Sequence, residues 1–167
     1  MTAEVDRWKQ ALTEEHDRAC RLLALIEAQQ ASIIARQFDA LSENIAAQTA
    51  VLSELFAAER FRKDTQLGVA TLLGVPAPGR RVDLYPLFPV ELAQEVETLV
   101  VRLQNAMAMS QRKFQQNVLL LSRSIELAQQ VLQRSGVTSP GRTYGAKGRE
   151  RAFALPGNTL SRWSSVV

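Results

Sequence analysis

The chain has 167 residues with a formal net charge of +3, and 46% of its residues are hydrophobic while only 6% are aromatic. This composition excludes a wholly disordered chain and points to a core built from aliphatic helix faces. No apolar run reaches the roughly 18 residues of a membrane-spanning helix, and the acidic N-terminal segment is unlike a signal peptide. We therefore expect a cytoplasmic protein without membrane insertion.

The first predicted helix covers about residues 3–35. Apolar residues recur there at spacings of three and four, which is typical of a helix with one apolar face. The polar residues Glu15 and Gln29 occupy the same phase as the apolar ones. The apolar members of this face are Val5, Trp8, Leu12, Ala19, Leu22, Ile26 and Ile33.

A second helix is predicted over about residues 38–73, where Phe38, Leu41 and Ile45 begin a heptad pattern. We expect Gly74 to adopt the left-handed conformation that ends it. The residues joining the two helices, RQFD at 36–39, contain neither Gly nor Pro, although Asp39 is a candidate cap for the second helix. One continuous kinked helix is therefore an alternative, but we favour a tight reversal into an antiparallel pair.

A connector over residues 74–90 holds four of the six prolines and separates the second helix from a third, predicted over about 90–134. The connector should have no regular secondary structure, but its apolar residues Leu84, Tyr85, Leu87 and Phe88 should fold over one end of the bundle. The third helix is the longest, at roughly 65 Å for a rise of about 1.5 Å per residue. Part of its apolar face should therefore lack a partner within the chain.

Beyond Gly136 the sequence is rich in Gly, Ser, Pro and Arg, which predicts a flexible tail over 137–167 after a single helical domain over 1–136. Five basic residues and one acidic residue lie between 135 and 167. The tail thus holds the positive charge, and the helical part offers no nucleic-acid-binding surface. The expected architecture is all-α, with long antiparallel helices in a coiled-coil-like three-helix bundle.

Residues that could carry catalysis or bind a metal are scarce. His16 and Cys20 lie one helical turn apart, but two ligands do not close a zinc site, and we expect Cys20 to be a buried small hydrophobe. The segment GVPAPGRR at 74–81 lacks the Lys and Ser/Thr of a phosphate-binding loop. The basic cluster RFRK at 60–63 should lie on a solvated helix face, with an acidic partner as the alternative. The sequence therefore predicts neither an enzyme nor a metal or cofactor site.

The apolar stripe in the second half of the third helix is the candidate binding surface. One interpretation makes it bundle core, and the other makes it an open groove for an amphipathic helix of a partner. The two interpretations can hold for different stretches of the same helix. The stripe comprises Met107, Phe114, Val118, Leu121, Ile125, Ala128 and Leu132.

Three stretches, in this order, resemble the FlgN family of flagellar export chaperones: LLALIEAQQASIIARQFDAL at 22–41, NVLLLSRSIELAQQVL at 117–132 and TYGAKG at 143–148. The resemblance covers nearly all of residues 10–148. It implies an all-α cytoplasmic chaperone that works without ATP. Such a chaperone binds hook-filament junction proteins, prevents their premature assembly and delivers them to the type III export gate.

The resemblance also implies roles for particular residues. Val118, Leu121, Ile125, Ala128 and Leu132 match the client-binding helix of the family, which masks the terminal amphipathic helices of the clients. Tyr144 looks like the tyrosine that contacts the cytoplasmic domain of the export gate. The alternative function is a structural coiled-coil or scaffold subunit with permanent helix-helix self-association, and the choice between monomer and homodimer stays open.

Overall fold

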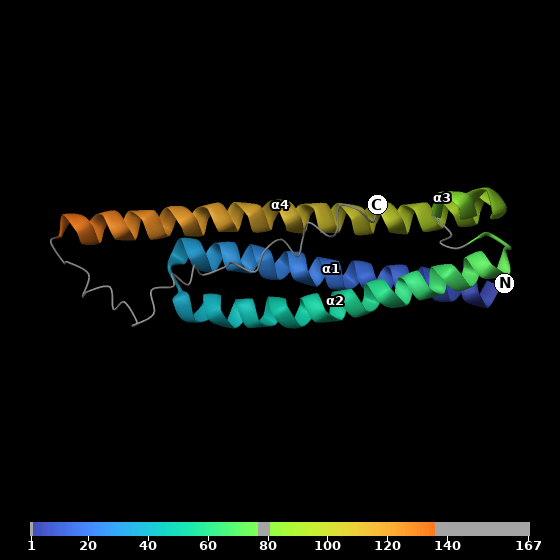
Figure 1. Ribbon diagram of the computed structural model, residues 1–167, viewed down its shortest axis with the longest axis horizontal. Coiled ribbons are helices and arrows are strands. Elements are labelled where there is room, and N and C mark those ends of the chain that lie inside the picture. Colours follow the sequence, from blue (N-terminus) through green and yellow to red (C-terminus); the bar gives the residue numbers. More distant parts are fainter. Residues whose placement is uncertain (1, 77–80, 136–167) are drawn as a thin grey trace, which may run out of the picture. The chain divides into compact units, whose positions relative to one another are not determined.

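The computed structural model describes residues 2–76 and 81–135, and this part of the chain is all-α, as predicted (Figure 1). Three long helices account for most of it: α1 (Thr2–Ala35), α2 (Phe38–Leu72) and α4 (Val90–Arg134). The short helix α3 (Arg81–Leu84) and the 3-10 turn η1 (Tyr85–Leu87) lie between α2 and α4 in the chain. They correct the expectation that the connector over 74–90 has no regular secondary structure. Each long helix begins and ends within one residue of the range expected from its periodicity.

The chain divides into two compact units, Met1–Asn117 and Val118–Val167. Helix α4 contributes residues to both, because the boundary falls within it. The segment 137–167, expected to be a flexible tail, lies outside the described residues, and Tyr144 lies there with it.

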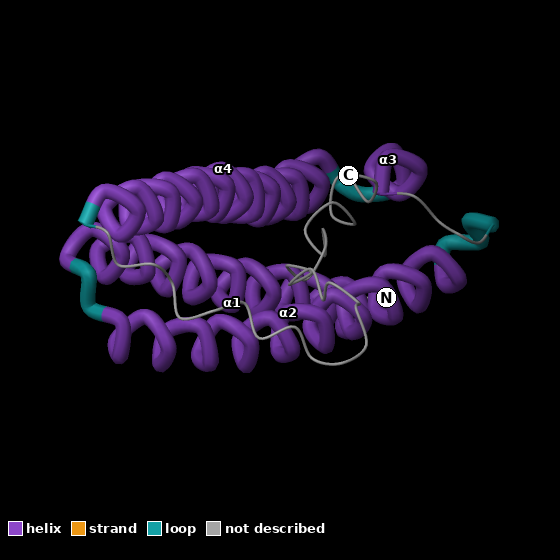
Figure 2. Tube along the Cα trace, turned by 60° about the vertical axis from the view of Figure 1, so that its left-hand side comes forward, coloured by secondary structure: helices purple, strands orange, loops and turns teal. Residues whose placement is uncertain are grey.

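In the first unit, α1 and α2 form an antiparallel pair joined by a short connection (Figure 2). Two polar contacts define their alignment. The guanidinium Nη1 of Arg21 lies 2.9 Å from Oε2 of Glu54, and Nδ2 of Asn44 donates to the Leu25 carbonyl at 2.9 Å. Because the partner number falls on α2 as the residue number rises on α1, the two helices run in opposite directions. This antiparallel pair confirms that the chain reverses rather than kinks.

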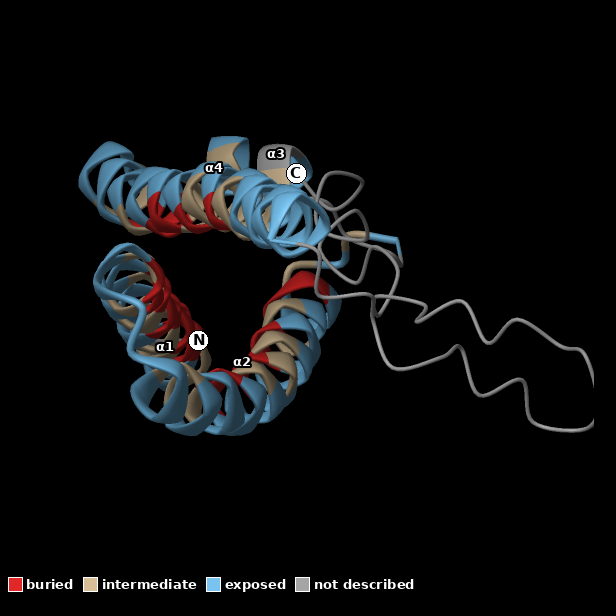
Figure 3. Cartoon of the chain, turned by 90° about the vertical axis from the view of Figure 1, so that its left-hand side faces the viewer, coloured by how far each residue is buried: buried red, intermediate tan, exposed pale blue. Residues whose placement is uncertain are grey.

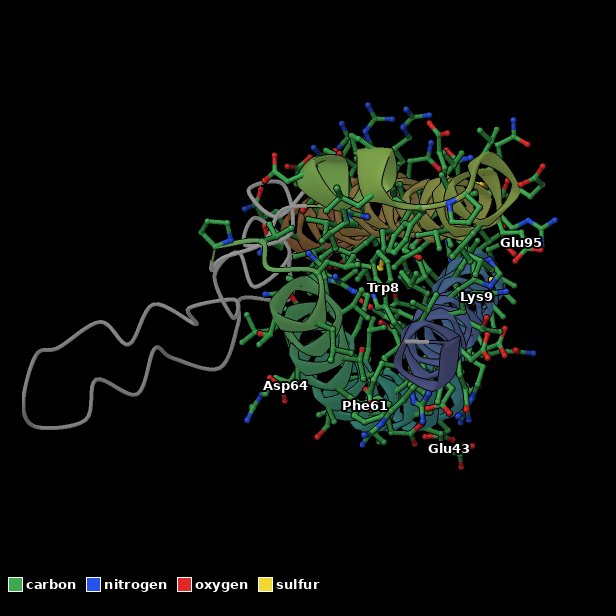
Figure 4. The ribbon with its side chains drawn as sticks, turned by 90° about the vertical axis from the view of Figure 1, so that its right-hand side faces the viewer. Trp8, Lys9, Glu43, Phe61, Asp64 and Glu95 are labelled. Carbon is green, nitrogen blue, oxygen red and sulfur yellow. The ribbon has the colours of Figure 1, made fainter. Side chains whose placement is uncertain are left out.

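The first part of α4 runs parallel to α1. Lys9 forms an ion pair with Glu95, and the two side chains point toward each other in Figure 4. Farther along, Nδ2 of Asn117 donates to the Ile26 carbonyl at 2.8 Å. The residue numbers rise together on both helices, so the order of directions in this unit is up, down, up.

The reversal between α1 and α2 is a helix C-cap with Arg36 in the left-handed region, at φ 56°. The backbone N–H of Gln37 donates to the Ser32 carbonyl at 3.0 Å, and that of Arg36 donates to the Ile33 carbonyl at 3.2 Å. This pair of bonds is the Schellman pattern, which usually uses Gly at the left-handed position. Asp39 does not cap α2, because the N-cap is Gln37 and makes no side-chain cap bond.

The end of α2 repeats the same pattern with the residue that the sequence predicted. Gly74 has φ 69°, and the N–H of Val75 donates to the Ala70 carbonyl at 2.9 Å. The N–H of Gly74 donates to the Thr71 carbonyl at 3.2 Å. The chain therefore leaves α2 at Gly74 with two carbonyls of its last turn, those of Ala70 and Thr71, paired.

The core of the first unit lies between the facing sides of α1, α2 and the first part of α4 (Figure 3). Trp8 is fully buried, and Figure 4 shows it directed into the space between the helices. Its ring lies 6.2 Å from that of Phe88, centroid to centroid. Leu84 is also fully buried, so the predicted packing of the connector on the bundle is confirmed for Leu84 and Phe88, whereas Leu87 is exposed.

The sequence suggested that the basic cluster at 60–63 lies on a solvated helix face, but the cluster is not wholly in solvent. Arg62 is buried and forms an ion pair with the buried carboxylate of Glu15. Its Nη1 also donates to Oε1 of Gln66 at 3.3 Å. The neighbouring Phe61 ring lies on the outside, where the Arg7 guanidinium sits 5.4 Å from its centroid. Glu15, which interrupts the apolar face of α1, thus has a buried partner on α2 in Arg62.

Candidate functional site

The buried positions of α4 end at Asn117. They are Val96, Val100, Leu103, Ala106, Ser110 and Asn117, and none of the described residues after Asn117 is buried. Side chains of the same apolar type continue for four more turns to Leu132. The segment Val118–Arg134 therefore has an apolar surface that the described residues leave in contact with solvent.

The seven residues predicted for the binding surface fall into two groups. Met107 and Phe114 belong to the first unit and are half-buried, so for them the core interpretation applies in part. The other five belong to the second unit. Val118 and Leu121 are half-buried, whereas Ile125 is 57% exposed, Leu132 is 52% exposed and Ala128 is exposed as well. The open part of the predicted stripe thus begins after Leu121.

Four exposed or half-buried apolar residues in the same segment were not among those predicted. Leu119 is 61% exposed, Leu127 is 60% exposed, Val131 is 65% exposed, and Leu120 is half-buried. Leu120, Leu127 and Val131 follow spacings of seven and four, so they form a second row beside the predicted one. The sequence contains this spacing, but a search that follows only one line of apolar residues along the helix misses it.

Asn117, the last residue of the first unit, is a buried polar residue facing α1. Besides its bond to the Ile26 carbonyl, its Nδ2 donates to Oε1 of Gln29 at 2.9 Å. Its Oδ1 has no hydrogen-bond partner among the described residues. Gln29 is the second polar residue on the apolar face of α1. It therefore pairs with Asn117, the last buried residue of α4.

Polar side chains within and beside the exposed segment leave its apolar surface continuous. The Ser124 hydroxyl donates to the Leu120 carbonyl at 2.8 Å, so its polarity is directed to the helix backbone. Arg123, Glu126 and Arg134 are exposed along the remaining circumference. The segment is therefore an amphipathic helix in which the apolar side is the larger feature.

The only cysteine of the sequence lies on the exposed surface of α1, which corrects the expectation that it would be buried. Its Sγ is 3.5 Å from Nε2 of His16, and Nδ1 of His16 is 3.4 Å from Oδ1 of Asp17. Partial desolvation on the helix raises the pKa of the Cys20 thiol, and the charge of Asp17 raises it further. Within residues 2–76 and 81–135, no three His, Cys, Asp or Glu side chains gather as metal ligands.

Comparison with protein families gives a match over most of the chain. A protein-family model described as FlgN protein matches residues 1–152 of this chain. No curated protein and no solved structure matches it. None of the helices in the described part of the chain is long and apolar enough to cross a membrane.

Proposed function

Because the chain belongs to the FlgN family, and that family consists of flagellar export chaperones, we propose that it holds hook-filament junction proteins before their export. In this proposal the exposed apolar surface of Val118–Arg134 covers an amphipathic helix at the C-terminus of the client. Covering that helix prevents the clients from assembling too early, and the complex is then delivered to the type III export gate. Contact with the gate is assigned to Tyr144, which lies outside the described residues.

The observation that carries the proposal is the exposure of large apolar side chains along about two turns of one helix. Ile125, Leu127, Val131 and Leu132 are each more than half exposed and lie within eight residues of one another. Contiguous apolar patches of this kind mark interaction sites, because water contact with them is unfavourable. A helix laid along such a patch removes it from water and places its own apolar anchors at matching intervals.

The proposal predicts that the double substitution Ile125→Ser with Leu132→Ser weakens client binding by about tenfold or more, the loss expected when two apolar anchors are removed from an interface. Both positions are exposed, so the fold should be preserved, which circular dichroism can check. Affinity for a purified hook-associated protein would be measured by isothermal titration calorimetry. Affinity equal to that of the unsubstituted chain would mean that the surface is not the client site.

Tyr144→Ala serves as the control for this experiment. It should bind the client as tightly as the unsubstituted chain while lowering the amount of client exported in a complemented strain. Unchanged export would refute the assignment of the gate contact to Tyr144. It would not affect the proposed client site. Self-association that hides Ile125 and Leu132 in every condition, with no exchange for a client, would instead support the structural coiled-coil alternative.

A further inference from the structure

One flank of α4 is mainly charged before Asn117, with Met109 as an apolar exception, and is apolar after it. At about 100° per residue, Glu95, Arg102 and Lys113 lie on the same flank of the helix as Leu120, Leu127 and Val131. In the first unit this flank faces polar side chains of α1: Glu95 pairs with Lys9, and Nζ of Lys113 lies 3.9 Å from Oε1 of Glu27. After Asn117 the same flank carries leucine and valine, two of them 60% and 65% exposed.

The change gives the segment Val118–Arg134 two apolar rows. We call Val118, Leu121, Ile125, Ala128 and Leu132 the first row, and Leu120, Leu127 and Val131 the second row. Ser124 lies between the rows, but its hydroxyl is bonded to the Leu120 carbonyl. Together the rows span about half of the helix circumference, wider than the roughly 100° stripe that a helix needs to pack on one side.

The edges of the two rows differ in charge. On a helical projection, Arg123 and Arg134 border the second row, whereas Ser122, Gln129 and Gln133 border the first. A partner helix on the second row would therefore place its edge residues beside two guanidinium groups. Carboxylates at that edge would complement them, and the first row offers no comparable charge.

We propose that the second row binds a second amphipathic helix of the same client, with acidic residues along the edge that meets Arg123 and Arg134. This inference rests on the proposed function, because it assigns the second row to the same client as the first. It extends the binding surface to a pair of client helices, which together cover both rows. The selectivity of the chaperone then depends on the acidic edge as well as on apolar anchors.

The test is the double substitution Leu127→Ser with Val131→Ser in the full chain, with Leu119→Ser as the matched control. Leu119 is 61% exposed but lies outside both rows, so its substitution removes a similar exposed side chain from another side of the helix. With a purified full-length hook-associated protein, the double variant should bind about tenfold more weakly or worse. The control should bind like the unsubstituted chain.

A charge test examines the acidic edge directly. Arg123→Gln with Arg134→Gln should weaken the same complex, and the remaining affinity should depend less on salt, since the ion pairs that salt screens are gone. Equal affinity and equal salt dependence would overturn the acidic-edge assignment.

The outcomes separate the inference from the function on which it rests. If the unsubstituted chain binds no hook-associated protein, the proposed function fails and the second row has no client. If the unsubstituted chain binds and the Leu127, Val131 double variant binds equally well, only the inference fails. If that variant changes the oligomeric state in light scattering while client affinity is unchanged, the second row is a contact between two copies of this chain, which also overturns the inference.

Discussion

Glu15 occupies an apolar phase of α1, seven residues after Trp8, and its carboxylate meets Arg62 inside the bundle. Burial raises the pKa of Glu15 above its ordinary value of 4.5, and this outweighs the lowering by the charge and hydrogen bond of Arg62. Glu59 adds a smaller rise, and Arg81 opposes it. The ionised pair is therefore a specific contact whose charged carboxylate is costly to hold away from water.

This pKa shift predicts how stability depends on pH. In the window from pH 4.5 up to the raised pKa, the folded state binds more protons at Glu15 than the unfolded state does. Stability from this group is therefore fully present below pH 4.5 and is lost as the pH rises through the raised pKa. Urea unfolding of the unsubstituted chain and of Glu15→Gln, at a series of pH values, should show a difference in unfolding free energy that declines across this window.

The matched control for that experiment is Glu43→Gln, which removes an exposed carboxylate of α2 and leaves the buried pair in place (Figure 4). Its pH dependence should follow that of the unsubstituted chain. A difference between Glu15→Gln and the unsubstituted chain that stays constant, or grows with pH, would contradict the raised pKa.

The turn between α1 and α2 shows how an element can end without the residue that usually marks its end. Arg36 takes the left-handed conformation that costs an L-residue about 1–2 kcal/mol, because the reversal requires it. Since RQFD lacks Gly, the sequence alone left a kinked continuous helix open. The Gly74 end of α2 was predictable because that glycine stands next to a proline-rich connector.

Arg36→Gly should stabilise the protein by up to about 1 kcal/mol, because the relief of left-handed strain exceeds the added entropy of the unfolded chain. Gly74→Ala should do the opposite by about 1 kcal/mol, since its φ of 69° disfavours a side chain although no atom within 4 Å would obstruct one. Urea unfolding midpoints would measure both. A lower midpoint for Arg36→Gly would show that the arginine side chain contributes more than the backbone conformation costs.

The periodicity of α4 predicted its length but only half of its exposed surface. Spacings of three and four located the first row, because each apolar residue was sought from the preceding one along a single seam. Leu120, Leu127 and Val131 form the second row, and the spacing of the first row does not show where a second row becomes exposed. That depends on where the neighbouring helices cease to bury α4, which is a property of the packed bundle.

At the scale of the whole molecule, the division at Asn117 separates a segment with buried positions from one without them. The all-α fold and the helix ranges followed from periodicity and from the Gly and Pro residues at 74–90. The partners of Glu15 and Gln29 did not, because pairing residues such as Glu15 with Arg62, 47 positions apart, requires knowing how the helices align. Both polar residues looked like interruptions of a face, and both are bonded members of it.

Hydrogen exchange should therefore be uneven along α4. Amides in Val118–Arg134 should exchange faster than those in Val90–Asn117, because only the earlier part has buried side chains among the described residues. Exchange followed by mass spectrometry would measure this, and adding a hook-associated protein should slow exchange in Val118–Arg134. Equal protection along the whole helix would contradict the division.

The contact of Asn117 with Gln29 also decides how far α4 can slide along α1. A shift of one heptad toward the α1 N-terminus would bring Leu22 to the place of Gln29, and the Asn117 amide would lose its side-chain acceptor. A buried polar group left without its partner costs about 1–3 kcal/mol, so the shifted arrangement would be populated several-fold to more than a hundredfold less. The hydrogen bond between Asn117 and Gln29 thus fixes the axial register of the two helices, which sets how many turns of α4 pack against α1.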